Sequence, residues 1–281
     1  MPQVRRHAVL CGTRVNIEER GEGPTLVCLH GLGGGVHFFA ALAAALQDRY
    51  HTIALDFPGA GFSPPLPRFS FDALADIVVE LAASETAPIL CLLGHSMGTI
   101  VALEALRRSP GLARGFIAVG GLSDPLPGAR SRIAARAEEI KRNGMAGLGN
   151  SVAAANLCAE TLERRPELAA LFSRVFELQP ADGYVATADA LASWTARQPP
   201  FLDNVRCLTV TGEHDLYAPP DAVREFARTL PAGTDVLVVP HAAHLPFLEQ
   251  PAAFAGIVSR FLDRLADVAA PSSSDARGPE L

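Results

Sequence analysis

Six short and nearly continuous apolar runs recur along the chain, and longer helical patterns separate most of them. Runs of Val, Ile and Leu without polar alternation are typical of strands that are buried on both faces. The pattern therefore predicts an α/β fold with a mostly parallel sheet and helices on both faces. The expected strands span residues 25–30, 51–56, 88–95, 115–121, 205–213 and 234–242, and the expected helices span residues 36–47, 70–84, 97–109, 219–230 and 251–268.

Two segments fall outside this alternation. The N-terminal stretch HAVLCGTRVNIEERGEG is typical of an antiparallel edge hairpin that turns at Gly12 and Thr13. Residues 123–203 hold Ala-, Arg- and Glu-rich helical stretches without a strand. They predict a helical cap, inserted after the sixth strand, over the sheet edge where open α/β sheets bind ligands. We expect residues 1–122 and 204–268 to form the α/β core, with the cap as an insertion in the same domain and 269–281 as a flexible tail.

The composition is that of a globular protein with a sizeable core. Hydrophobic residues make up 49% of the 281 residues and charged residues 19%. The formal charge of −6, without a long basic block, excludes a nucleic-acid surface, and no apolar run approaches a membrane span of about 18 residues. Five cysteines without a C-x-x-C pair indicate a reducing compartment. We expect a cytoplasmic protein, with a homodimer left open as its assembly.

The stretch CLLGHSMGTIVALEAL, residues 91–106, places a serine between an apolar strand pattern and an apolar helix pattern. A helix cap at Ser96 would need no glycine on either side of it. The G-x-S-x-G turn of a nucleophile does need them, because strand and helix come close there. Gly94 and Gly98 meet that requirement. We therefore predict that Ser96 is a catalytic nucleophile.

A serine hydroxyl needs a base, and the base needs an acid that orients it. In the chain order Ser, Asp, His, each of these residues follows a strand. Asp215 follows CLTVTGEH and His244 follows VLVVPHAA, so these two are the predicted acid and base. Asp124, after the preceding strand, is the alternative acid. His241 lies three residues before His244, but the pair has no third ligand nearby in sequence, and no metal is expected.

Backbone N–H groups beside the serine are expected to hold the developing oxyanion. We predict Met97, at the start of the helix, and Leu32, in the loop HGLGGGVHFF, as the two donors. The glycines of that loop, with the carboxylate of Asp56, imitate a dinucleotide-binding fingerprint. The position of the third glycine holds Val36, and a dinucleotide site would leave the serine, aspartate and histidine unexplained. We expect no cofactor.

Three residues are candidates for substrate binding, namely His30, Arg130 and Trp194. The cap stretch RSRIAARAEEIKRNGM, residues 130–145, places several cationic side chains on a helical pattern. Such a pattern is typical of a solvated face, but one arginine turned inward could hold a substrate carboxylate. Trp194 is the only tryptophan, and it either packs in the core or lines the pocket.

Five motifs together resemble the α/β-hydrolase superfamily: HGLGGG, DFPGAGFS, GHSMG, GEHDLYAPP and HAAHLPFLEQP. Epoxide hydrolases and haloalkane dehalogenases, which look otherwise similar, carry an aspartate where this chain has Ser96. The cap stretches RIAARAEEIKRNGMAGLGNSV and ELQPADGYVATADALASW resemble the 3-oxoadipate enol-lactonase group, whose members open a carboxylate-bearing lactone. The chain departs from that group around Trp194 and at His241, where a glycine is more usual.

The motifs and the resemblance lead to one prediction and two alternatives. We predict a cofactor-free serine hydrolase that cleaves an ester or lactone of a small organic acid through an acyl-enzyme on Ser96. The small-molecule substrate could itself carry a carboxylate. A carbon–carbon bond hydrolase of a ring-cleavage product would use the same three residues. A ligand-binding module would keep the pocket but turn over negligibly.

Overall fold

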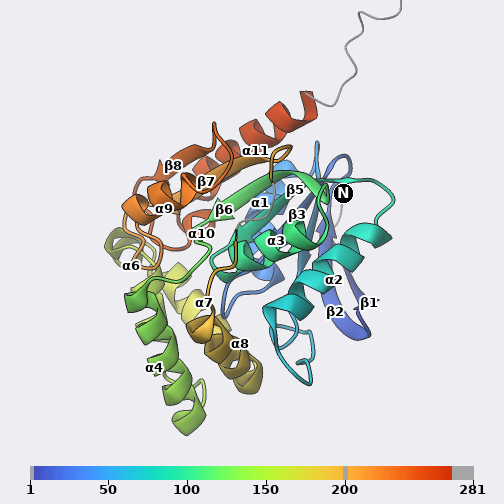
Figure 1. The fold of residues 1–281 in the computed structure, drawn as a ribbon. Coiled ribbons are helices and arrows are strands. Elements are labelled where there is room, and N and C mark those ends of the chain that lie inside the picture. Colours follow the sequence, from blue (N-terminus) through green and yellow to red (C-terminus); the bar gives the residue numbers. More distant parts are fainter. Residues whose placement is uncertain (1–2, 199–201, 268–281) are drawn as a thin grey trace, which may run out of the picture.

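One sheet of eight strands runs through the computed structural model, which describes residues 3–198 and 202–267 (Figure 1). The strands are β1 (Val4–Leu10), β2 (Thr13–Arg20), β3 (Thr25–Leu29), β4 (His51–Leu55), β5 (Ile89–His95), β6 (Ala113–Val119), β7 (Arg206–Gly212) and β8 (Asp235–Val239). Their order in the sheet is β1-β2-β4-β3-β5-β6-β7-β8. β2 pairs antiparallel with β1 and β4, and the other neighbours pair in parallel. The predicted mostly parallel sheet with an antiparallel N-terminal hairpin is confirmed.

The hairpin turns at Cys11 and Gly12, one residue earlier than the sequence predicted. Both residues have positive φ angles, 49° and 72°. A two-residue hairpin turn of type I′ requires this left-handed conformation at both central positions. Thr13 pairs with Leu10 and belongs to the second strand. The predicted turn at Gly12 and Thr13 is wrong because a cysteine occupies the first left-handed position, where glycine or asparagine is expected.

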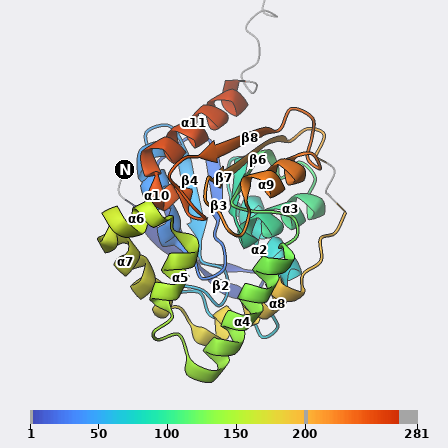
Figure 2. The same cartoon turned by 90° about the vertical axis from the view of Figure 1, so that its left-hand side faces the viewer.

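Helices cover both faces of the sheet (Figure 2). Two helices, α1 (Ala40–Leu46) and α11 (Pro251–Asp267), pack on one face, and three helices, α2 (Phe71–Ser84), α3 (Met97–Arg108) and α9 (Pro220–Ala227), pack on the other. A 3₁₀ turn (Val36–Phe39) leads into α1, and a one-turn helix, α10 (Pro246–Glu249), precedes α11. The sequence pattern did not predict α10. None of the helices within the described ranges combines the length and the apolar character needed to cross a membrane.

The cap consists of five helices between β6 and β7, and it lies beyond one edge of the sheet in both views (Figures 1 and 2). These are α4 (Pro127–Asn143), α5 (Gly149–Asn156), α6 (Ala159–Arg164), α7 (Pro166–Glu177) and α8 (Ala181–Ser193). The predicted helical insertion after the sixth strand is therefore confirmed. Its boundaries as part of a single domain stay a prediction, and the predicted tail at 269–281 lies outside the described residues.

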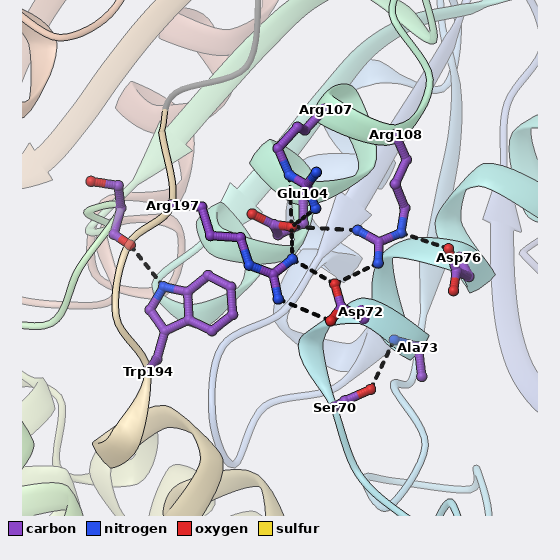
Figure 3. A network of polar contacts seen from close by, with 10 residues as sticks. Ser70, Asp72, Ala73, Asp76, Glu104, Arg107, Arg108, Trp194 and Arg197 are labelled. Atoms are coloured by element: carbon purple, nitrogen blue, oxygen red, sulfur yellow. Dashed lines mark hydrogen bonds and ion pairs between the residues drawn. The ribbon is translucent and has the colours of Figure 1, made fainter.

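Ion pairs fix the chain where it returns from the cap to the core (Figure 3). Arg197, which follows α8, contacts Asp72 of α2 at 2.6 Å and Glu104 of α3 at 2.7 Å. Glu104 is buried, and Arg107 and Arg108 of its own helix also bond to it. A buried carboxylate is stable only when cations and hydrogen bonds compensate its lost hydration. The hydrogen bond from Arg197, followed by that from Arg108, holds the pKa of Asp72 well below its usual range. The network therefore ties the end of the cap to two core helices.

The cap also touches the core backbone directly, at two glycines. Gly183 in α8 lies against Gly59 in the loop after β4, and a Cβ atom on Gly183 would come within 2.0 Å of the Gly59 carbonyl oxygen. No side chain can be accommodated at that distance without moving the backbone of one element. The helix and the loop therefore pack as closely as they do only because both positions lack side chains.

Because of this contact, we expect Gly183→Ala to destabilise the protein, whereas the same substitution at an ordinary helical glycine stabilises it. In an open helix, alanine in place of glycine stabilises by about 0.5 to 1 kcal/mol. At position 183 we expect the free energy of unfolding to fall by about 1 to 3 kcal/mol, because α8 must move away from the loop. Urea unfolding followed by circular dichroism measures the difference.

Gly256→Ala in α11 is the matched control. A Cβ atom there meets only the end of the flexible Arg260 side chain, at 3.4 Å. This variant should be slightly more stable than the native protein. Stabilisation by Gly183→Ala of the same size as by Gly256→Ala would contradict the close packing of α8 on the loop.

Candidate active site

Ser96 lies in the turn between β5 and α3, in a left-handed backbone conformation with φ of 52° and ψ of −116°. Its side chain forms no capping hydrogen bond with α3. A Cβ atom on Gly94 would come within 2.4 Å of the Gly98 carbonyl oxygen, and one on Gly98 within 2.2 Å of the Leu29 carbonyl oxygen. The flanking glycines therefore allow the strand and the helix to approach each other, as the sequence argument required. The half-buried serine is left at the carboxyl end of the sheet.

His244 and Asp215 form a buried pair beside this turn. His244 Nδ1 lies 3.0 Å and 2.9 Å from the two carboxylate oxygens of Asp215. Because an ionised carboxylate can only accept, Nδ1 carries the proton and Nε2 is left with a lone pair. His244 and Ser96 line one cavity, and the ring hydrogen bonds of His244 in the described part of the chain run to Asp215 rather than to Ser96.

The surroundings of Asp215 favour its ionised form. Burial alone would raise the pKa of this carboxyl. The neighbouring His244 ring and the backbone N–H groups of Ala218 and Tyr217, at 3.0 and 2.8 Å, outweigh burial and hold the pKa below its usual value. Asp124, the alternative acid, forms an ion pair with Arg130 instead. Of the two carboxylates, Asp215 is the one that the structure brings to the histidine.

Two residues that the sequence reading missed hold the backbone of His244. Its N–H donates to the carbonyl of Asn156 in the cap, at 3.0 Å. Its carbonyl oxygen lies 3.0 Å from Nε2 of His95, the residue before the serine. Burial holds the pKa of His95 well below its usual value, so the ring is neutral and its Nε2–H donates. The place of His95 beside the serine was the only sequence signal for this contact.

The two predicted oxyanion donors lie on either side of the serine. Met97 is the first residue of α3 and Leu32 lies in the loop after β3, where it lines the same cavity as Ser96 and His244. This loop approaches the serine closely, because a Cβ atom on Gly31 would lie 2.9 Å from Cβ of Ser96. The placement agrees with the predicted roles, which stay predictions.

His30 is used inside the protein. Its Nδ1 contacts the Gly31 carbonyl at 2.7 Å, and its Nε2 accepts the N–H of Phe57 at 2.9 Å. Burial lowers the pKa of His30, against the opposing charge of Asp56, so the ring is neutral and both nitrogens have partners. In this arrangement His30 joins the loops after β3 and β4, and no ring nitrogen is left for the substrate contact that the sequence predicted.

Arg130 and Trp194 lie outside the cavity beside Ser96. Arg130 donates to the Ala192 carbonyl at 2.9 Å in addition to its ion pair with Asp124. The indole N–H of Trp194 donates to the Ser123 carbonyl at 3.0 Å (Figure 3). Its ring packs edge-on against Phe71. Substrate binding by these two residues was predicted from the sequence, but the structure gives both side chains structural partners instead.

Arg136 is the cap arginine that faces the cavity. It donates to the hydroxyl oxygens of Tyr217 and Tyr184, at 3.1 and 3.4 Å. The inward arginine predicted from residues 130–145 therefore exists, but it is not Arg130. Ile133 and Ile140 are buried, and Arg136 lies between them on the same stripe of α4. That spacing was the sequence signal that could have identified it.

The cavity has two lobes that meet at the serine. One lobe is lined by Arg136, Asn156, Phe172 and His244, and we call it the charged lobe. The other is lined by Leu122, Pro125, Ala129 and Ala218, and we call it the apolar lobe. Ser96, Ile133, Leu191 and Tyr217 line both lobes. A ligand that reaches both lobes therefore passes the serine hydroxyl.

The acidic residue of the dinucleotide-like pattern has internal partners. Asp56 is buried and accepts from the N–H groups of Val36 and Phe62, at 2.8 and 2.9 Å, and from the Asn16 amide at 2.8 Å. It therefore joins β2, the 3₁₀ turn and the loop after β4 rather than facing a ligand. Within residues 3–198 and 202–267, no group of three or more His, Cys, Asp or Glu side chains is placed to hold a metal ion.

Comparisons with known proteins agree with this architecture. A sequence model described as "Alpha/beta hydrolase family" matches residues 26–257. The pimeloyl-[acyl-carrier protein] methyl ester esterase of Chromobacterium violaceum is 32% identical over 264 residues, which cover 88% of this chain and 97% of the relative.

Two solved structures share the fold across almost their whole length. The enol-lactonase from Burkholderia xenovorans has a TM-score of 0.82 at 24% identity, covering 92% of this chain and 100% of that chain. A thermophilic esterase from Thermogutta terrifontis, solved with malate bound, has a TM-score of 0.81 at 24% identity, covering 93% of this chain and 99% of that chain. At this level of identity the likeness concerns the fold alone.

The buried pair predicts how stability depends on pH. Asp215→Asn should lower the free energy of unfolding at neutral pH by about 1 to 3 kcal/mol, the range for hydrogen bonds to a charged group. Because the folded-state pKa of Asp215 is lowered, its stabilisation is fully present above the unfolded value of about 3.9. It is lost as the pH falls through the lower folded value. Urea unfolding of both proteins, from neutral pH to the acid limit of the fold, should show the difference shrinking in acid.

Asp221→Asn is the control for a carboxylate that does not contact the site. Asp221 is exposed, and its one ion pair within the described residues is with Arg224 of its own helix. This variant should stay within about 0.5 kcal/mol of the native protein at every pH. A loss from Asp215→Asn that does not diminish in acid would show that the ionised carboxylate is not what stabilises the pair.

Proposed function

Because the chain belongs to the alpha/beta hydrolase family and its relatives include a methyl ester esterase, we propose that it is a serine hydrolase. It would cleave an ester or lactone of a small organic acid through an acyl-enzyme on Ser96. The observation that carries the proposal is the buried His244–Asp215 pair, which lines one cavity with a serine held in a strained, left-handed turn. A histidine that is oriented by a carboxylate and keeps a lone pair on Nε2 can activate a hydroxyl.

In the first half of the reaction, the Ser96 oxygen attacks the substrate carbonyl and His244 Nε2 takes its proton. Asp215 keeps the ring in the required tautomer and stabilises the imidazolium. The N–H groups of Leu32 and Met97 bond to the oxyanion of the tetrahedral intermediate. The carbon–oxygen bond to the leaving alcohol then breaks, and His244 returns the proton to that oxygen.

In the second half, a water molecule replaces the alcohol. The oxygen of this water attacks the acyl carbon while His244 takes one of the water's protons. The bond between the acyl carbon and the Ser96 oxygen then breaks, and His244 returns the proton to the serine. The products are a carboxylic acid and an alcohol, or one hydroxy acid when the substrate is a lactone. No step needs a cofactor.

Three observations support an ester or lactone as the substrate class. The relative at 32% identity is named a methyl ester esterase, and the similar folds include an enol-lactonase and an esterase with malate bound. The two lobes are lined mostly by apolar side chains around a few polar groups, as sites for small molecules are. A cytoplasmic location and a homodimer are kept as proposals from the sequence.

Ser96→Ala should abolish turnover. Because serine, histidine and aspartate act as a unit, we expect kcat to fall by about 10⁴-fold or more on phenyl esters and on lactones. A fluorophosphonate probe should label the native protein and Ser131→Ala, but not Ser96→Ala. Ser131 is a suitable control because it is exposed on the cap and its hydroxyl donates to the Pro127 carbonyl of its own helix.

The same measurements decide between this proposal and its alternatives. Turnover retained by Ser96→Ala would remove the nucleophile and with it the acyl-enzyme. Labelling of the native protein without multiple turnover on any ester or lactone would favour a ligand-binding module. Turnover confined to vinylogous diketones, followed by their absorbance, would favour carbon–carbon bond hydrolysis.

A further inference from the structure

The cationic side chain of Arg136 faces the cavity, and its hydrogen-bond partners among the described residues are neutral groups. In the described ranges it forms no ion pair with a carboxylate, whereas Arg130 and Arg142 on the same helix pair with Asp124 and Glu139. Its partners are the hydroxyls of Tyr184 and Tyr217. A guanidinium stays charged at every relevant pH and presents five N–H donors, so two phenol oxygens leave donors free.

The phenols do not supply the missing negative charge. Tyr184 is buried, and burial raises the pKa of its hydroxyl although the nearby Arg136 opposes the shift. The hydroxyl is therefore a neutral acceptor at neutral pH. A half-buried cation with only neutral partners is compensated best when an anion enters its cavity. Because the guanidinium fork matches a carboxylate, a carboxylate on the ligand is the group that fits.

The division of the cavity shows on which side of the ester bond this anion would lie. His244, which must give a proton to the leaving oxygen, lines the charged lobe together with Arg136 and does not line the apolar lobe. The leaving oxygen has to face the histidine that protonates it. The part of the substrate attached to that oxygen therefore extends into the charged lobe.

The acyl part then occupies the apolar lobe. That lobe is lined by Ser96 and Met97 and by the apolar residues Leu122, Pro125 and Ala129. Helix α4 serves both lobes with one face, because Ala129 and Ile133 line the apolar lobe while Ile133 and Arg136 line the charged lobe. These positions are spaced by four and three residues, as neighbours on one helix face are.

We propose that the enzyme selects substrates that carry a carboxylate on the leaving-group side of the ester bond, bound by Arg136, and a small apolar acyl group on the other side. The inference rests on the proposed function. In such an ester, the bond from the Ser96 oxygen to the acyl carbon forms, and the bond from that carbon to the carboxylate-bearing alcohol breaks. The serine proton passes through His244 to that alcohol. In a lactone, the carboxylate would be attached to the carbon that bears the ring oxygen.

Two matched pairs of esters separate the sides of the bond. 3-Acetoxybenzoate and 3-acetoxybenzamide carry a charged or a neutral group on the leaving phenol. Monophenyl adipate and its terminal amide carry the same difference on the acyl group. With the native protein we expect kcat/KM to be about 10- to 100-fold higher for the benzoate than for the benzamide, the range for a charge-assisted hydrogen-bonded pair. No such preference is expected for the charged acyl group.

Arg136→Gln should remove the preference for the charged leaving group, so that the ratio of kcat/KM for the benzoate to that for the benzamide falls to about one. Arg142→Gln is the matched control, since Arg142 is exposed on the same helix and pairs with Glu139. Its preference should equal that of the native protein. Inhibition of phenyl acetate hydrolysis by 3-hydroxybenzoate and 3-hydroxybenzamide gives the same comparison on the native protein alone, so the test does not depend on the folding of a variant.

The outcomes distinguish this inference from the proposed function. A preference for the charged acyl group that is lost in Arg136→Gln would reverse the assignment of the lobes. Equal rates and equal inhibition within each pair would show that Arg136 does not bind the carboxylate. Retained hydrolysis of the neutral 3-acetoxybenzamide by Ser96→Ala would instead overturn the acyl-enzyme mechanism itself.

Discussion

The left-handed backbone of Ser96 is the constraint on which the rest of the site depends. Such a conformation costs a residue with a side chain on the order of 1 to 3 kcal/mol, so the surrounding structure must hold it in place. The N–H of Ser96 donates to the Val119 carbonyl at the end of the neighbouring strand, at 2.8 Å. The carbonyl oxygens of Gly98 and Leu29 lie where side chains on the flanking glycines would be. Close packing of two strands and one helix therefore keeps the serine in this turn.

The histidine is held from three directions, and one of them is the cap. Asp215 orients the ring of His244, His95 donates to its backbone carbonyl, and Asn156 of α5 accepts its backbone N–H. The cap thus helps to position the base as well as covering the serine. The ion pairs of Arg197 with α2 and α3 fix the other end of the cap. Because α3 also begins at the serine, one helix connects the nucleophile to the network that anchors the cap.

The sequence predicted the fold and the ends of the strands well because these depend on local pattern. Continuous apolar runs show buried strands directly, and the residues that follow them share one edge of a parallel sheet. This reasoning places Ser96, Asp215 and His244 at one edge of the sheet. It failed in the cap, where Arg130 was chosen over Arg136, because the rotation of α4 about its axis is set by tertiary packing. To identify Arg136, one must know that Ile133 and Ile140 form the buried stripe of α4, and composition does not show this.

His241 stands where the 3-oxoadipate enol-lactonase group usually has a glycine, and this difference has a physical explanation. This residue has a φ of 54°, in the left-handed region, where glycine is favoured. Its ring contacts Glu160 of α6 at 2.6 Å. The histidine therefore accepts a strained backbone and gains a contact to the cap that glycine could not make. Its side chain is mostly exposed, so the contact contributes at most about 1 kcal/mol. It lies three residues before His244, on the same loop.

The charge of Arg136 bears on the chemistry as well as on binding. Tyr217 connects Arg136 to His244, since its hydroxyl accepts from Arg136 and its ring packs against His244 with centroids 4.7 Å apart. A permanent cation one phenol ring away opposes the imidazolium that forms when His244 takes the serine proton. Like charges repel each other more strongly in a partly buried site than in water, because the effective dielectric there is lower. A carboxylate bound to Arg136 would cancel most of this repulsion. The anion would then favour the transition state directly, so that selection for it would act on kcat as well as on KM.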